Sequence, residues 1–154
     1  MFSGRQSIFI PFDREVVYKT AETYPYFVRF FLKDSRILEQ SDEHIKVEVN
    51  TKLLGFFPSR WQGAGRKKRY QGIRFTQTKG LFKGLTALWQ FSEVSQGTRV
   101  SIRTVFSKPQ ISRLGEWLLG KFVVEDTTRK ILSELRNCLE SDRRRVSAEK
   151  VQIS

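Results

Sequence analysis

The chain has 154 residues, of which 39% are hydrophobic and 13 are Phe, so we expect one domain with a sizeable core rather than a disordered chain. Its formal charge of +12 favours phosphate-bearing partners, either nucleic acid or an anionic membrane, or else a basic surface in contact with solvent only. A single Cys and a single His exclude an internal disulfide and a zinc site built on Cys and His ligands. We therefore expect no metal and no cofactor.

The first residues and the hydropathy of the sequence predict the cellular compartment. Residues 1–6 lack the apolar run of a signal peptide, and no segment approaches the roughly 18 to 20 apolar residues that cross a membrane. Cys138 is typical of a small buried residue in a reducing compartment. These features predict a soluble, cytoplasmic protein, with a peripheral position at the inner membrane face left open by the charge.

The first third of the chain predicts one strand and two short helices. Residues 6–10 form the strand, and Asp13 is a suitable N-cap for the first helix. Pro25 is well placed to open a second, aromatic helix over residues 25–31, because its missing N–H is not needed in the first turn.

Strand patterns fill the middle of the chain. Residues 44–53 alternate apolar and polar over ten positions, which is typical of a half-buried antiparallel strand. The other predicted strands are 35–40, 59–62, 66–70 and 73–77, with a turn or bulge at 63–65, and a hairpin of 85–94 and 98–107.

Residues 111–139 carry apolar side chains at helical spacing over far more than an average helix. Such a helix needs a broad apolar surface, which the strands supply. We therefore predict an α+β domain over residues 1–140, in which a curved antiparallel sheet of six to seven strands wraps around the C-terminal helix. The Arg-rich residues 141–154 are expected to be a disordered basic tail.

Several phrases, in this order and spacing, resemble a known family. They are Tyr24-Pro25-Tyr26-Phe27-Val28, Gly80-Leu81-Phe82-Lys83, Leu85-Thr86-Ala87-Leu88-Trp89-Gln90-Phe91 and Gly97-Thr98-Arg99-Val100. Together they resemble the polyketide cyclase/coenzyme Q-binding branch of the START-like (helix-grip, SRPBCC) superfamily. The resemblance implies an apolar cavity between sheet and helix. That superfamily includes lipid carriers, aromatic cyclases and a ribosome-association toxin, so the fold does not fix the function.

Strand alternation and the resemblance together predict the residues that line the cavity. They are Phe27, Phe31, Val47, Val49, Trp89, Phe91, Ile102, Phe106, Leu118 and Phe122. Plain core packing is the competing interpretation of the same pattern. We expect residues 111–122 of the helix to border the cavity and residues 131–139 to anchor it.

A second set of residues is basic and has no acidic residue among it. It comprises Arg66, Lys67, Lys68, Arg69, Lys79 and Lys83. We predict that this set contacts an anionic membrane surface, and ribosome or RNA binding is the alternative.

Polar residues that could reach the cavity are Arg60, Tyr70, Arg74 and Thr104. His44 falls on the polar face of its strand, and the inward faces carry no paired carboxylates, so we predict no catalytic residue. The sequence therefore favours a carrier for a lipid-, quinone- or polyketide-like molecule. Ribosome association is the second hypothesis, and an aromatic polyketide cyclase/dehydratase is the third.

Overall fold

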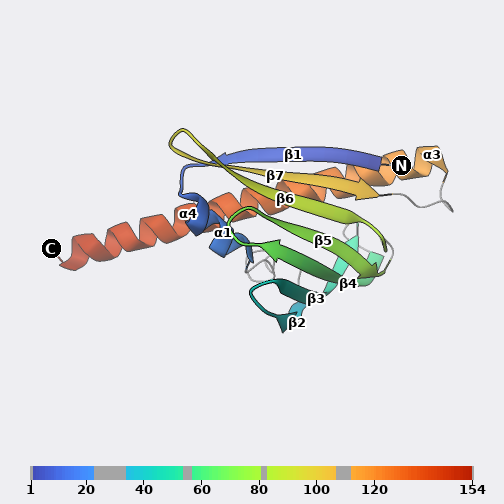
Figure 1. Ribbon diagram of the computed structural model, residues 1–154, viewed down its shortest axis with the longest axis horizontal. Helices are drawn as coiled ribbons and strands as arrows, with labels where there is room; N and C mark the ends of the chain where they lie inside the picture. The colour runs from blue at the N-terminus through green and yellow to red at the C-terminus, as the bar shows by residue number, and fades with distance from the viewer. Residues whose placement is uncertain (1, 23–33, 54–56, 81–82, 107–111, 154) are drawn as a thin grey trace.

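The computed structural model describes residues 2–22, 34–53, 57–80, 83–106 and 112–153. It consists of a curved antiparallel sheet and a long C-terminal helical rod that lies along one face of the sheet (Figure 1). This arrangement confirms the predicted helix-grip architecture. The predicted aromatic helix at residues 25–31, with Phe27 and Phe31, lies outside the described residues.

The sheet has seven strands in the order β1-β7-β6-β5-β4-β3-β2, and every neighbouring pair is antiparallel. The strands are β1 Phe2–Ile10, β2 Asp34–Gln40, β3 His44–Leu53, β4 Phe57–Lys68, β5 Gly72–Lys79, β6 Thr86–Val94 and β7 Gly97–Phe106. β1 pairs with β7, so the first strand of the chain lies at one edge of the sheet, beside the last strand. The strands from β2 to β7 follow one another through short connections, as the hairpin spacing predicts.

The helices are α1 Arg14–Glu22, α3 Arg113–Leu119, the π-helical turn η1 Gly120–Glu125, and α4 Asp126–Ile153. The predicted single helix is thus interrupted by η1, where the sequence contains Gly120. π-Helical turns of this kind interrupt the regular hydrogen-bond ladder of a long helix. The sequence predicts a disordered basic tail from residue 141, whereas in the structure α4 continues through Ile153 and extends past the sheet (Figure 1).

Residues 63–65 were expected to form a turn or bulge, but they lie inside β4. The reason is packing: a Cβ at Gly63 would overlap the ring of Phe75, and a Cβ at Gly65 would lie 2.6 Å from Cγ2 of Ile45. These glycines give the neighbouring side chains room on the sheet surface. The turn falls instead at residues 69–71, where Tyr70 has a left-handed φ of 62°.

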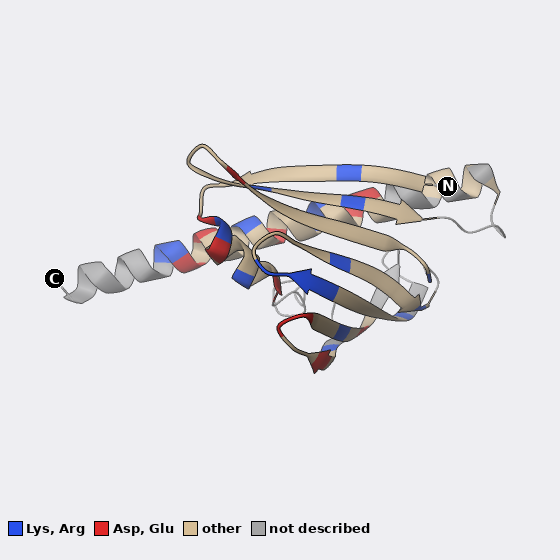
Figure 2. Ribbon diagram, in the orientation of Figure 1, with Lys and Arg blue, Asp and Glu red and all other residues tan. Residues whose placement is uncertain are grey.

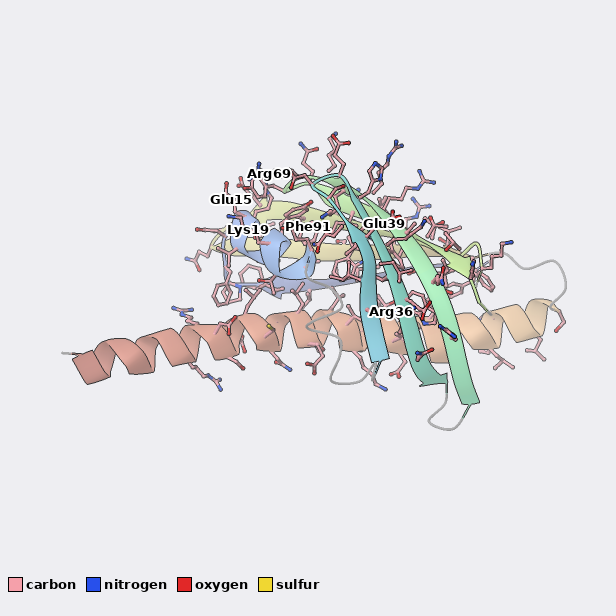
Figure 3. The ribbon with its side chains drawn as sticks, turned by 90° about the horizontal axis from the view of Figure 1, so that it is seen from below. Glu15, Lys19, Arg36, Glu39, Arg69 and Phe91 are labelled. Carbon is pink, nitrogen blue, oxygen red and sulfur yellow. The ribbon has the colours of Figure 1, made fainter. Side chains whose placement is uncertain are left out.

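The core lies between the sheet and the helices. The main contacts of η1 and α4 are with β1, whereas α1 packs against β6, β7 and α4. α4 contributes Ile131, Leu132, Leu135 and Leu139, which are all buried. Full burial of each such side chain stabilises the fold by about 1.5–3 kcal/mol. Figure 3 shows the rod beneath the sheet, with α1 at one end of the sheet and Phe91 beside it.

Candidate functional site

The concave face of the sheet, which is turned toward the helices, receives alternate residues from every strand. Cross-strand register places Trp89 opposite Ile102, and Val47 opposite Gly63. The predicted cavity residues on the strands occupy this face and are buried, with exposed fractions from 0% to 6%: Val47, Val49, Trp89, Phe91, Ile102 and Phe106. The alternation of polar and apolar residues was sufficient to find this set.

Two further aromatic residues lie on the same face, and the sequence pattern did not reveal them. Trp61 and Phe75 are half-buried, and their rings meet edge to face with centroids 6.0 Å apart. They come from β4 and β5, away from the strands that η1 and α4 contact most. The sequence does carry a signal for Trp61, because Trp61, Gly63 and Gly65 are spaced by two residues, which is the period of a strand. The expectation of a turn at the two glycines hid this pattern.

The helical side of the predicted site differs from expectation. Leu118 is 39% exposed instead of facing the sheet. α3 lies beyond the ends of β1 and β7, so no strand is opposite it (Figure 1). Leu114 and Trp117 on the same short helix are also exposed, and Lys121 Nζ lies 5.0 Å from the Trp117 ring centroid. The side chain of Phe122 lies outside the described part of the chain.

Of the four polar candidates, Thr104 alone lies on the concave face, where it is 3% exposed and opposite Ala87. The prediction that Arg60 and Arg74 reach the cavity is corrected by the structure. Both side chains are exposed on the outer, convex face, because their strand positions have the opposite parity to Trp61 and Phe75. Tyr70 lies in the β4–β5 turn, where its hydroxyl accepts a hydrogen bond of 2.9 Å from Arg69 Nη2.

Two buried polar atoms on the inner side have no hydrogen-bond partner among the described residues. One is Oε1 of Gln77, which lies on β5 two positions after Phe75 and directly opposite Gly63. The other is the hydroxyl of Tyr18 on α1, whose ring packs edge to face on Phe91 at 5.4 Å. Burial, with a contribution from Glu22, raises the pKa of Tyr18 to about 12. Buried polar groups usually have a hydrogen-bond partner, so these two atoms are exceptions on the inner side of the described structure.

The structure also corrects the prediction that Lys67 belongs to an anion-binding surface. Its side chain is 2% exposed and faces inward from β4. Its Nζ lies 3.5 Å from Oε2 of Glu22 at the end of α1. A buried ammonium needs such a partner, because desolvation penalises an isolated charge. The rest of the predicted basic set is exposed: Arg66, Lys68, Arg69, Lys79 and Lys83.

The outer face also holds a carboxylate. Glu48 is 5% exposed, because Arg60 Nη2 and Arg36 Nη2 lie 2.7 Å and 3.2 Å from its Oε1, and Gln62 donates a 2.9 Å hydrogen bond to Oε2. The hydrogen bonds from Arg60 and Gln62 hold the pKa of Glu48 below its ordinary value. Glu48 is therefore a charged residue with its partners in place, and it lies on the face away from the helices.

The chemistry available on the concave face is binding through apolar contacts and a few hydrogen bonds. His44 is exposed at the start of β3. Across the described ranges, no three His, Cys, Asp or Glu side chains gather in a way that could hold a metal ion. None of the described helices has the length and apolar character needed to cross a membrane.

The curved sheet, the long helix and the aromatic concave face define a START-like helix-grip domain. The chain belongs to the family described as polyketide cyclase / dehydrase and lipid transport, whose sequence profile matches residues 10–136. No curated protein matches the sequence.

Solved structures share this fold at low sequence identity. A protein from Thermus thermophilus is 19% identical with a TM-score of 0.78, over 92% of this chain and 99% of that one. The Zhui aromatase/cyclase from a Streptomyces strain is 14% identical with a TM-score of 0.75, over 93% and 94%. A START superfamily protein from Mycobacterium smegmatis is 12% identical with a TM-score of 0.68, over 90% and 97%.

Proposed function

We propose that the protein binds a hydrophobic or amphipathic small molecule, of lipid, quinone or polyketide type, along the concave face of the sheet. The observation that carries this proposal is the pair of half-buried aromatic side chains, Trp61 and Phe75, on β4 and β5, whereas the main strand contacts of η1 and α4 are with β1. Membership of the family supports the same class of ligand.

The polar end of such a ligand would meet Gln77, whose buried Oε1 accepts a hydrogen bond from a hydroxyl or an amide. The apolar part would lie across Trp61 and Phe75. Each buried CH₂ group contributes about 0.8 kcal/mol, so a ten-carbon chain supplies about 8 kcal/mol before the entropy lost on binding is subtracted. That amount is enough for retention without any catalytic residue.

The same proposal includes contact with an anionic membrane at the end of the molecule that carries α3. This end presents exposed Leu114 and Trp117. The loop between β5 and β6, which carries the exposed Lys83, lies toward the same end (Figure 1). Aromatic and aliphatic side chains beside lysines are typical of surfaces that rest on a membrane interface.

The first test is native mass spectrometry of the protein as purified, followed by incubation with a long-chain fatty acid and with a short-chain ubiquinone. We expect at least one species to be retained at a one-to-one ratio. Trp61 and Trp89 then serve as reporters in a Trp117→Phe background, and their fluorescence should change saturably with the retained probe.

Phe75→Ala should weaken binding of that probe about 10-fold, the effect expected for loss of part of an aromatic contact surface. Leu88→Ala is the matched control, because Leu88 lies on β6 with its side chain on the outer face. The carrier function is wrong if no probe is retained and the fluorescence does not change, or if both variants weaken binding equally.

Membrane contact has a separate test. Binding to phosphatidylcholine vesicles that contain phosphatidylserine should fall when Trp117 is changed to Ser. The double change Arg129→Gln and Arg144→Gln removes charge from α4 and should leave most of the binding in place. Loss of binding in the charge variant, with Trp117→Ser unaffected, would show that net charge alone holds the protein on vesicles.

A further inference from the structure

Register aligns basic residues from four strands into one row across the outer face of the sheet. Arg5 of β1 lies opposite Arg103 of β7, which in turn lies opposite Leu88 of β6. Leu88 lies opposite Arg74 of β5, and Arg74 lies opposite Arg66 of β4. Figure 2 shows the corresponding blue segments on β1, β7, β5 and β4 one below another, with the rod behind the sheet.

The four arginines of this row, which we call the arginine row, are all exposed. Neighbouring strands are about 4.8 Å apart, so the row extends over about 19 Å from Arg5 to Arg66. His44 of β3 continues it beyond Arg66. Residues as distant in sequence as 5 and 103 thus lie in one row of positive charge, interrupted by Leu88 on β6, which no local run of the sequence displays.

The row contains two pairs of like charges directly opposite one another, Arg5 with Arg103 and Arg66 with Arg74. Such pairs destabilise a sheet. No ion pair between described residues joins any member of the row to a carboxylate, in contrast to Arg36 and Arg60, which share Glu48. The buried outer-face carboxylate Glu48 is thus engaged by Arg36 and Arg60 and not by the row.

The surroundings of the row favour an extended polyphosphate. Ser7 and Gln90 lie on the adjacent row of the outer face, where both are exposed and can donate hydrogen bonds to phosphate oxygens. A shallow concavity of about 500 Å³ is lined in part by outer-face side chains, namely Arg66, Lys68, Arg74, Leu88 and Gln90. Glu43 is the acidic residue in this lining, and Lys67, Ile73 and Trp89, which have inner-face positions, also contribute to it.

We propose that the arginine row binds the backbone of a single-stranded nucleic acid. Arginine matches phosphate through its planar fork of donors, and all four charges of the row are arginines. The sheet as a whole curves away on this side, apart from the local concavity beside Arg66 and Arg74, so a flat membrane would touch only part of the row, whereas a flexible strand can follow it. This site is independent of the concave-face ligand, since the two lie on opposite faces of the sheet.

The test uses the full chain and a fluorescently labelled single-stranded poly(U) RNA, with anisotropy measured over a range of salt concentrations. In the row variant, Arg5, Arg66, Arg74 and Arg103 are all changed to Gln. In the control variant, four exposed cations elsewhere are changed to Gln: Lys19, Lys83, Arg129 and Arg144. Both variants lose the same formal charge.

Counterion release predicts a slope of about −0.7 in log affinity against log salt for each phosphate contact on a single strand. At 0.1 M salt each arginine then contributes about 5-fold to the RNA affinity. The row variant should therefore bind RNA several hundred-fold more weakly, and its slope of log affinity against log salt should be shallower by about 3. The control variant should lose about 10-fold at most and keep its slope. The thermal midpoint of the row variant, which loses only repulsive pairs, verifies that it remains folded.

Equal losses of affinity in the two variants would overturn the proposal, because binding would then follow net charge alone. Failure of the wild-type chain to bind the RNA would also overturn it. A third contrary result is a row variant that keeps its RNA affinity but no longer sediments with vesicles of phosphatidylcholine and phosphatidylserine. That result would assign the row to a membrane.

Discussion

The two faces of the sheet are made by the same seven strands, residue by residue in alternation, and they differ in almost every property. The concave face is aromatic and aliphatic, with a few buried polar atoms such as Gln77 Oε1. The outer face is more polar and carries the exposed arginine row. One sheet can therefore hold an apolar ligand on one side and a polyanion on the other, since period-two alternation separates the two sets of side chains.

The faces should respond differently when a side chain is removed. Phe91→Ala should lower the free energy of unfolding by about 3–5 kcal/mol, because Phe91 is 3% exposed and packs on Tyr18 and Trp89. Its sequence neighbour Gln90 points outward, and Gln90→Ala should change stability by about 0.5 kcal/mol or less. Urea denaturation measures both. Similar costs for the two variants would contradict the assignment of faces.

The faces should also differ when one heavy atom is added to a small side chain. Gly63→Ala places a Cβ into the Phe75 ring and should cost about 1–3 kcal/mol. Ala64→Ser, on the outer face, should be nearly neutral. Phe75→Leu should recover part of the loss at Gly63, which a double-mutant cycle on chemical denaturation would reveal as coupling. Additive effects would mean that the ring can move aside freely.

The buried hydroxyl of Tyr18 gives a smaller effect with a sign that depends on pH. Tyr18→Phe should change stability at neutral pH by about 1 kcal/mol or less, because the hydroxyl has no partner among the described residues. The folded protein holds the phenol proton up to about pH 12, whereas the unfolded chain releases it near pH 10. The wild type should therefore lose stability as pH rises from 10 to 12.

Tyr18→Phe should lose less stability over the same interval. Thermal midpoints across the alkaline range measure the difference. Parallel curves for wild type and variant would show that the pKa of Tyr18 is not raised by folding.

The smallest effect belongs to the outer face. Arg66→Gln should raise stability by up to about 0.5 kcal/mol at low salt, since it removes one like-charge pair with Arg74. The gain should shrink at high salt, where charges are screened. Lys79→Gln is the control, because its cross-strand neighbour is the uncharged Gln62. A destabilised Arg66→Gln variant, compared by thermal midpoint with that control, would mean that the row is not repulsive.

Alternation along single strands was enough to assign the inward positions of Val47, Val49, Trp89, Phe91, Ile102 and Phe106. A β-strand sends successive side chains to opposite faces whatever its partners are, so this information is local. The long apolar helical pattern, together with the run of strands, likewise determined the helix-grip architecture.

Three features depended on tertiary structure. Gly63 continues a strand instead of turning because Phe75 from the next strand occupies the space above it. Lys67 is buried because the inward phase of β4 carries it toward Glu22 on α1. The arginine row exists only through register, which brings Arg5 beside Arg103 and Arg66 beside Arg74. Local periodicity decides which face a side chain occupies, whereas its neighbours on that face are decided by which strands pair, and in which register.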